Sequence, residues 1–249
     1  MPRETRLLMG MPVTVDIVDG DAPLRLIGDV FGYLSGVDQR FSLFKPGSEI
    51  CAINRGDVMR SEASADMQEV FAIADLTCKE TNGYFDMRRP DGSFDPSGIV
   101  KGWAIRNSAG LIRKAGVKNF YVDAGGDIQS GGVNGAGKEW KIGIRNPFNA
   151  NQIIKAVTPK GRGIATSGTY VRGDHIYNPH KPGEKVADIV SLTVIGPDVL
   201  EADRFATGAF AMGKDGIDFI EAQRNLEGYA VDANGIATMT SGFGDFVAT

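Results

Sequence analysis

The alternation of apolar and polar positions predicts a strand near the start of the chain, where Val13, Val15 and Ile17 are separated by polar residues. Apolar residues then recur at helical spacing over residues 23–36, which indicates an amphipathic helix. Further strands are expected at 120–123, 140–144, 153–157, 189–195, 229–231 and 236–239, and further helices at 64–83, 95–116, 202–212 and 216–223.

Two of these helices have clear start signals. Ser64 can act as the N-cap of one, and Asp95 followed by Pro96 is typical of the first residues of another. Strands and helices do not alternate regularly, so we expect an α+β fold of mixed or antiparallel sheets and packed helices rather than a doubly wound sheet. Residues 1–249 contain no repeat, low-complexity tract or linker, and this predicts one compact domain.

Composition narrows the class of protein. The net charge is −4 and no basic run is present, so nothing indicates a nucleic-acid partner. No stretch approaches the roughly 18 apolar residues of a membrane span, and the first residues resemble neither a signal peptide nor a lipid-anchor motif. A cytoplasmic protein is therefore expected. The two cysteines, Cys51 and Cys78, are expected to be buried free thiols. With only two cysteines and two histidines in the sequence, a structural zinc site is not expected.

Residues 95–103 form the first segment that can carry chemistry. Free amides at a helix N-terminus attract anions, and Gly98 and Gly102 permit a close approach of the backbone. An equally good interpretation is that Asp95 only caps the helix, Lys101 is solvated and the glycines serve packing.

Paired glycines follow a predicted strand in the second segment, residues 121–128. Gly125 and Gly126 can form a backbone nest for a phosphate, although a plain hairpin turn is the favoured interpretation of this segment alone. The G-x-G-x-x-G spacing of dinucleotide-binding proteins is missing.

Hydroxyl groups lie beside glycines in the third segment, residues 163–170, where Thr166 and Ser167 suit a polar ligand. His175 follows and can accept a proton near neutral pH, but a structural histidine is the default for a single His. In the fourth segment, Asp203 and Thr207 are four residues apart on a predicted helix, so their oxygens share one face. That pair suits Mg²⁺ rather than zinc, and a solvated helix face would have the same pattern.

Taken in order, these segments resemble the ApbE family, the FAD:protein FMN transferases. The likeness extends over residues 9–213 and includes 9–15, 41–54, 83–86, 95–102, 125–128, 165–168, 175–179 and 202–207. It implies that FMN is transferred from FAD to a Thr or Ser hydroxyl of an acceptor protein, with release of AMP. Water as the acceptor, which would make the protein an FAD pyrophosphatase, and flavin binding without catalysis remain as alternatives.

The resemblance also implies roles for single residues. It assigns His175 and Asp203 to catalysis, and Mg²⁺ or Mn²⁺ to Asp203, Thr207 and the backbone carbonyls of Gly98 and Ala206. The FAD site is assigned to Met9, Phe44, Tyr84, Phe85, Asp86, Asp95, Lys101, Gly125, Gly126, Thr166, Ser167, His175 and Ile176.

This sequence departs from the family pattern at several positions. Phe44 replaces a tyrosine and Asn178 replaces an aspartate. Only residues 87–94 separate Asp86 from Asp95, where the family usually has a long excursion, so a more open site is expected.

Overall fold

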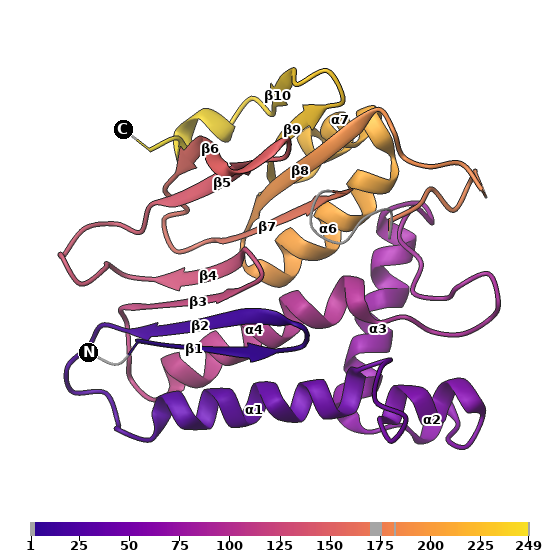
Figure 1. The fold of residues 1–249 in the computed structure, drawn as a ribbon, viewed down its shortest axis with the longest axis horizontal. Helices are drawn as coiled ribbons and strands as arrows, with labels where there is room; N and C mark the ends of the chain where they lie inside the picture. Colours follow the sequence, from indigo (N-terminus) through magenta and orange to yellow (C-terminus); the bar gives the residue numbers. More distant parts are fainter. Residues whose placement is uncertain (1–2, 170–175, 182, 249) are drawn as a thin grey trace.

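The structure is a computed structural model that describes residues 3–169, 176–181 and 183–248. Within these ranges, eight strands form one antiparallel sheet in the order β1-β2-β3-β4-β7-β8-β9-β10 (Figure 1). They are β1 (Arg3–Leu8), β2 (Met11–Ile17), β3 (Phe120–Ala124), β4 (Asp127–Gly131), β7 (Gly163–Gly168), β8 (Ile189–Gly196), β9 (Glu227–Asp232) and β10 (Ala237–Met239). A separate hairpin consists of β5 (Ile142–Asn146) and β6 (Asn149–Val157).

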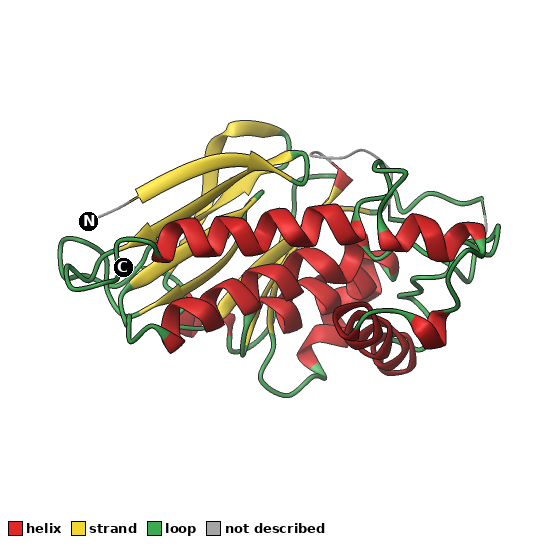
Figure 2. Cartoon of the chain, turned by 90° about the horizontal axis from the view of Figure 1, so that it is seen from below, coloured by secondary structure: helices red, strands yellow, loops and turns green. Residues whose placement is uncertain are grey.

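Helices gather on one face of the sheet (Figures 1 and 2). They are α1 (Leu26–Phe41), α2 (Glu49–Arg55), α3 (Ala65–Glu80), α4 (Ser97–Lys114), α6 (Val199–Ala211) and α7 (Gly216–Glu221). The described residues also form short 3-10 turns, which are η1 (Arg60–Glu62), η2 (Gly213–Asp215) and η3 (Phe243–Phe246). Val13, Val15 and Ile17 of β2 are fully buried against Leu34 of α1 and Ile105 of α4 in one apolar cluster. The α+β class is therefore confirmed, and so is the strand predicted at Val13, Val15 and Ile17, which is β2.

The middle of the sheet is covered on both faces. On the helical side, α6 packs on β7 and β8, where Ala165 and Leu192 are completely buried. On the other side, β5, β6 and η3 enclose a second cluster that contains Ile164, Ile195 and Phe243. Because successive strand residues face opposite layers, the central strands are buried nearly throughout, whereas the edge strands β1 and β10 are largely exposed.

Side-chain caps fix the starts of two helices, of which the sequence predicts the cap of α3. Ser64 Oγ accepts a hydrogen bond from Met67 N at the start of α3, at 3.4 Å. Asp198 does the same for Glu201 N at the start of α6, at 3.0 Å. These caps fix where α3 and α6 begin. The segment that follows α3 and residues of α6 itself contribute to the site described below.

Among the described strands and α-helices, four were not expected from the sequence: β1, β4, β7 and α2. Strand β4 reads Asp-Ile-Gln-Ser-Gly, and all five residues are buried, so no apolar alternation marks it. Its Gln129 is satisfied internally, since the side chain donates to Gly161 O and accepts from Val199 N, each at 3.0 Å. Buried polar groups with complete hydrogen bonding escape a search for hydrophobic periodicity.

Cys51 and Cys78 are free, as expected, but both are only half-buried. No helix in the described ranges is both long enough and apolar enough to cross a membrane.

Candidate active site

The connection between α3 and α4 leads into the first turn of α4. Asp95 Oδ1 accepts a hydrogen bond from Ser97 N at 3.0 Å, and Asp95 Oδ2 lies 2.5 Å from Arg89 Nη2. The helix begins at Ser97 with Pro96 as its N-cap, so the prediction of Asp95 as the N-cap is wrong by one residue. Asp95 nevertheless holds the helix start through this local turn.

A buried cluster of charges lies one turn into α4. Lys101 Nζ is 2.5 Å from Asp127 Oδ2 at the start of β4 and 3.5 Å from Asp203 Oδ1 in α6. The two carboxylates are almost completely buried, and the Lys101 side chain is 17% exposed. One ammonium thus serves two carboxylates from separate elements, and Lys101 is paired inside the protein rather than solvated.

Backbone amides hold both carboxylates in place. Asp203 Oδ2 accepts a hydrogen bond from Gly102 N at 2.8 Å, and Asp127 Oδ1 accepts one from Thr166 N at 3.0 Å. Burial is the main cause that raises the pKa of Asp203 above its usual range; the Lys101 ammonium opposes this shift, and the neighbouring Asp127 carboxylate adds to it. With both carboxylates ionised the cluster has two negative charges and one positive charge, so a further cation would stabilise the ionised form of Asp203.

Two glycines allow α4 and α6 to pack closely around this cluster. A Cβ atom at Gly102 would lie 2.8 Å from Asp203 Cβ and 2.9 Å from Leu200 Cα. A Cβ atom at Gly98 would lie 2.7 Å from Phe85 Cε2 and 3.4 Å from Thr207 Cγ2. The close approach of α6 to α4, side by side in Figure 1, thus explains Gly102, and the Phe85 ring explains Gly98.

Hydroxyl groups line the same contact. Thr207 Oγ1 donates to the backbone oxygen of Asp203 at 3.0 Å and lies 3.4 Å from Ser167 Oγ on β7. On the opposite face of the sheet, away from α6, Thr166 Oγ1 is 2.9 Å from Thr193 Oγ1 of β8. Asp203, Thr207 and Gly98, which the resemblance assigns to one metal site, are therefore neighbours here. Ala206 precedes Thr207 in α6, and its side chain is fully buried.

Two tight hairpin turns lie next to each other. Met9 and Gly10 connect β1 to β2, Gly125 and Gly126 connect β3 to β4, and all four residues have positive φ angles. Positive φ at both central residues is typical of type I′ turns. A Cβ atom at Gly125 would lie 2.9 Å from Sδ of the flexible Met11 side chain, so the positive φ of 64° rather than space favours glycine here.

The turn at Gly125 and Gly126 is the hairpin that the sequence favours over a phosphate nest. Gly125 N donates to Pro12 O at 3.2 Å, and Gly126 N donates to Asp123 Oδ1 at 2.8 Å. Both amides are therefore already used within the protein. Contact of this turn with FAD stays a prediction.

Comparison with known proteins decides the family. A model of the ApbE family matches residues 9–89 and 87–230. This chain belongs to the ApbE family.

Relatives in that family have a named activity. An FAD:protein FMN transferase of Klebsiella pneumoniae (strain 342) is 31% identical over 155 residues, which cover 59% of this chain and 44% of the relative. The FAD:protein FMN transferase of Escherichia coli (strain K12) is 30% identical over 161 residues, which cover 61% of this chain and 46% of the relative. The chain thus spans about half the length of the curated relatives it matches.

Solved ApbE structures share the fold. The flavin transferase ApbE from Vibrio cholerae superposes with a TM-score of 0.85 at 23% identity, covering 98% of both chains. The ApbE protein from Thermotoga maritima gives a TM-score of 0.83 at 18% identity, covering 100% of this chain and 99% of that one. These likenesses establish an ApbE fold.

The FAD-site residues expected by the ApbE resemblance have unequal surroundings. Phe85 is 5% exposed, its ring lies against Gly98 of α4 and its Cβ atom lies near Gly208 of α6, so it forms a wall of the α4–α6 contact. Asp86 is exposed and accepts a hydrogen bond from Arg88 N at 2.8 Å. Phe44, between α1 and α2, is 94% exposed.

The segment after β7 is only partly described. His175 lies outside the described residues. Ile176 is described and half-buried, and it packs against the apolar cluster of α6, β7 and β8.

Sequence reasoning missed Asp127 as a site residue. It follows the paired glycines directly, and a carboxylate at a strand start next to a glycine turn is the signal that could have singled it out. Only the fold shows that this carboxylate is buried beside Lys101, because the two residues come from separate elements.

Proposed function

We propose that this protein transfers FMN from FAD to a Thr or Ser hydroxyl of an acceptor protein and releases AMP. The buried cluster of Lys101, Asp127 and Asp203 beside Thr207 is the observation that carries this proposal, because a reaction at a pyrophosphate needs fixed positive charge and oxygen ligands. Membership of the ApbE family and the activity named for its curated relatives support it. We further propose that residues 1–249 act as one catalytic unit.

The oxygen atoms at the α4–α6 contact suit a hard divalent cation. Asp203 and Thr207 supply side-chain oxygens, and the backbone carbonyls of Gly98 and Ala206 would complete the set for Mg²⁺ or Mn²⁺. A cluster of three or more His, Cys, Asp or Glu residues able to hold a metal is absent from the described ranges, which agrees with a site built mainly from hydroxyl and carbonyl oxygens. Such a cation would neutralise charge on the phosphates of FAD.

Residues of the chain would hold and orient the substrates. Lys101 holds the two carboxylates close together, and Gly102 N fixes the orientation of Asp203. Fixed groups of this kind need no reorganisation during the reaction. We assign removal of the acceptor hydroxyl proton to His175 or Asp203; a general base typically contributes about 10² to 10⁴-fold.

One assay tests the activity. The protein is incubated with FAD, Mg²⁺ and a candidate acceptor protein, and the mass of the acceptor is measured. A mass gain equal to FMN is expected. Free FMN with an unchanged acceptor would indicate hydrolysis of FAD, and intact FAD would indicate binding without catalysis; either result overturns the transferase proposal for that acceptor.

A matched pair of variants tests the site itself. Asp203→Asn should slow the mass gain by about 10² to 10³-fold, whereas Asp198→Asn should leave its rate unchanged. Both substitutions replace an aspartate by its amide in the same helix, but Asp198 is the N-cap, where asparagine serves equally well. Equal loss in both variants would point to a damaged helix instead.

A further inference from the structure

His180 joins two segments that are far apart in the sequence. Its Nε2 atom lies 2.9 Å from the backbone oxygen of Asn82, in the turn that follows α3. A carbonyl oxygen can only accept, so this nitrogen must carry the proton and donate it. The hydrogen bond therefore attaches the segment 176–181 to the turn at residues 82–84.

The ring of His180 makes a second contact with the same turn. It packs edge-to-face on Tyr84, with ring centroids 4.5 Å apart and an interplanar angle of 66°. It also covers Gly83, where a Cβ atom would lie 3.5 Å from His180 Cε1. Aromatic pairs prefer this geometry, so the ring adds directional packing to the hydrogen bond.

Both partners of this contact are held on their own sides. The turn is closed by a hydrogen bond from Gly83 N to Cys78 O at 2.7 Å, and Asn82 and Gly83 both have positive φ angles. On the other side, His180 N donates to Asn178 Oδ1 at 2.9 Å, and Ile176 packs on the α6 cluster. His180 is therefore a contact between two locally ordered pieces.

A neighbour on the same segment points to the same connection. Tyr177 is 38% exposed, and burial, followed by the nearby carboxylate of Asp86, raises the pKa of its phenol. The direct contacts of the segment with the turn at residues 82–84 are those of His180.

We propose that His180 is a positioning residue for the flavin nucleotide: it holds Tyr84 against the segment 176–181 so that both segments present one binding surface. The proposal rests on the proposed function, with FAD at Tyr84 as the ApbE resemblance assigns it. His180 acts through Tyr84 and not on the reacting atoms, so it should govern the affinity for FAD and leave the chemical step nearly unchanged.

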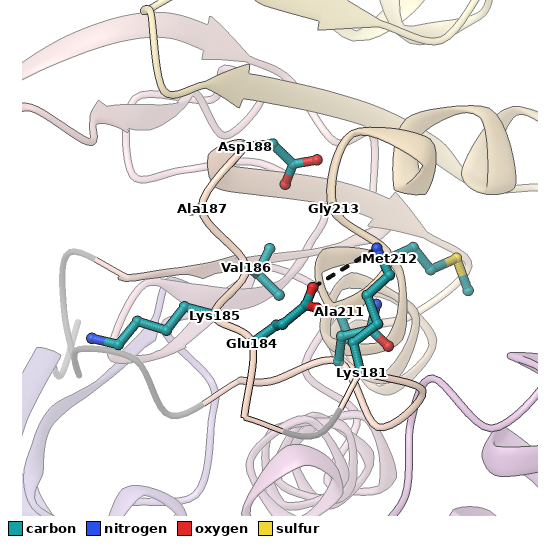
Figure 3. A pocket seen from close by; sticks show the side chains of 10 residues that line it. Lys181, Glu184, Lys185, Val186, Ala187, Asp188, Ala211, Met212 and Gly213 are labelled. Atoms are coloured by element: carbon teal, nitrogen blue, oxygen red, sulfur yellow. Dashed lines mark ion pairs between the residues drawn. The ribbon is translucent and has the colours of Figure 1, made fainter.

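The opposite side of this segment supplies a control. It borders a cavity of about 220 Å³ between the segment and the end of α6, where Lys181 and Glu184 form an exposed ion pair at 4.0 Å (Figure 3). Exposed ion pairs contribute little to stability. Lys181→Ala therefore changes the residue next to His180 without touching the contact with Tyr84.

The test measures the dissociation constant of FAD by flavin fluorescence, and the rate of FMN transfer at saturating FAD, in the full chain with Mg²⁺. His180→Ala should weaken FAD binding by about 5- to 30-fold, because the variant loses one hydrogen bond and one ring contact that hold Tyr84 in place. The saturated rate should change by less than about threefold. Lys181→Ala should bind FAD like the unmodified protein.

Two further variants separate the contacts. His180→Gln keeps a nitrogen donor for Asn82 O, and His180→Phe keeps a ring beside Tyr84; each should recover part of the lost affinity. Hydrogen exchange of the amides of residues 83–87 should become faster in His180→Ala and stay unchanged in Lys181→Ala. This readout does not depend on FAD.

The outcomes distinguish the two proposals. If the unmodified protein binds FAD but transfers no FMN, the proposed function fails while the affinities still test His180. Unchanged FAD affinity in His180→Ala, or a loss confined to the saturated rate, overturns the role of His180 and leaves the function standing. Absence of FAD binding by the unmodified protein overturns both.

Discussion

The centre of the candidate site and its rim are built in opposite ways. In the centre, Lys101, Asp127 and Asp203 come from two helices and a strand, are mostly buried and are fixed by backbone hydrogen bonds. At the rim, Phe44 and Asp86 lie on connecting segments, are exposed and have few partners. The difference indicates that charge is held rigidly where bonds are proposed to change, and that the residues proposed to contact the body of FAD are left free to adapt.

Replacing the central carboxylate should have the largest effect. Asp203→Asn keeps an oxygen that can accept from Gly102 N, so the helix contact should survive, but it removes the charge proposed to bind the metal. Transfer should fall by about 10² to 10³-fold, in line with the loss of one preorganised electrostatic group. The FAD dissociation constant should change by less than about tenfold. Near-normal turnover would contradict the assignment of Asp203 to the metal site.

Removing the central ammonium should mainly affect folding. Lys101→Met leaves two buried carboxylates without their cation, and breaking a buried ion pair typically costs about 3 to 5 kcal/mol. Urea unfolding measures this loss. Lys45→Met is the matched control, because Lys45 also lies 2.5 Å from a carboxylate, that of Asp38, but is 36% exposed. Its cost should stay within about 1 kcal/mol.

A double variant sharpens that comparison. Adding Asp127→Asn to Lys101→Met removes one of the stranded charges, so part of the stability should return. If Lys101→Met and Lys45→Met lower the free energy of unfolding equally, the buried ion pairs of the centre stabilise the fold no more than an exposed pair does. The contrast between centre and rim would then fail.

The same contrast decides what the sequence could predict. The hydrophobic period identifies α1 and β2, and capping residues locate the start of α3, because these signals are local. The order of glycine and hydroxyl motifs indicates the ApbE family and brings Gly98, Asp203 and Thr207 into one site.

Features that depend on packing could not be predicted in this way. Strand β4 is completely buried although it contains polar residues, so the alternation of apolar and polar residues does not mark it. The pairing of Asp127 with Lys101 joins residues on separate elements. The contact of His180 with Asn82 and Tyr84 likewise crosses about a hundred residues of sequence. Such contacts follow from the tertiary fold and leave no trace in local spacing.

The close helix contact supplies a prediction of intermediate size. Gly102→Ala would place a methyl group 2.9 Å from the backbone of Leu200, so α6 must shift and stability should fall by about 1 to 3 kcal/mol. Gly110→Ala in the same helix meets nothing within 4 Å and should stabilise the protein by up to about 1 kcal/mol. Thermal unfolding of the two variants gives the comparison directly. A loss of stability in both variants would mean that α4 itself does not tolerate alanine at a glycine position, independently of its contact with α6.

The smallest effect on the folded protein is expected at the rim. Phe44→Ala removes a ring that is 94% exposed, so the free energy of unfolding should change by less than about 0.5 kcal/mol. If the ring packs on FAD, as the ApbE resemblance implies, the KM for FAD should rise by about 3- to 10-fold, which corresponds to about 0.5 to 1.5 kcal/mol for an aromatic contact.

Leu24→Ala is the control for exposure alone. Leu24 is completely exposed and precedes α1, whereas Phe44 follows the same helix, so the two side chains are separated by roughly the 24 Å length of its 16 residues. This variant should change neither KM nor stability. A loss of stability in Phe44→Ala without a change in KM would place Phe44 in the folded core and remove it from the flavin site. A raised KM with unchanged stability would show that the rim contributes binding while the buried centre carries both the fold and the chemistry.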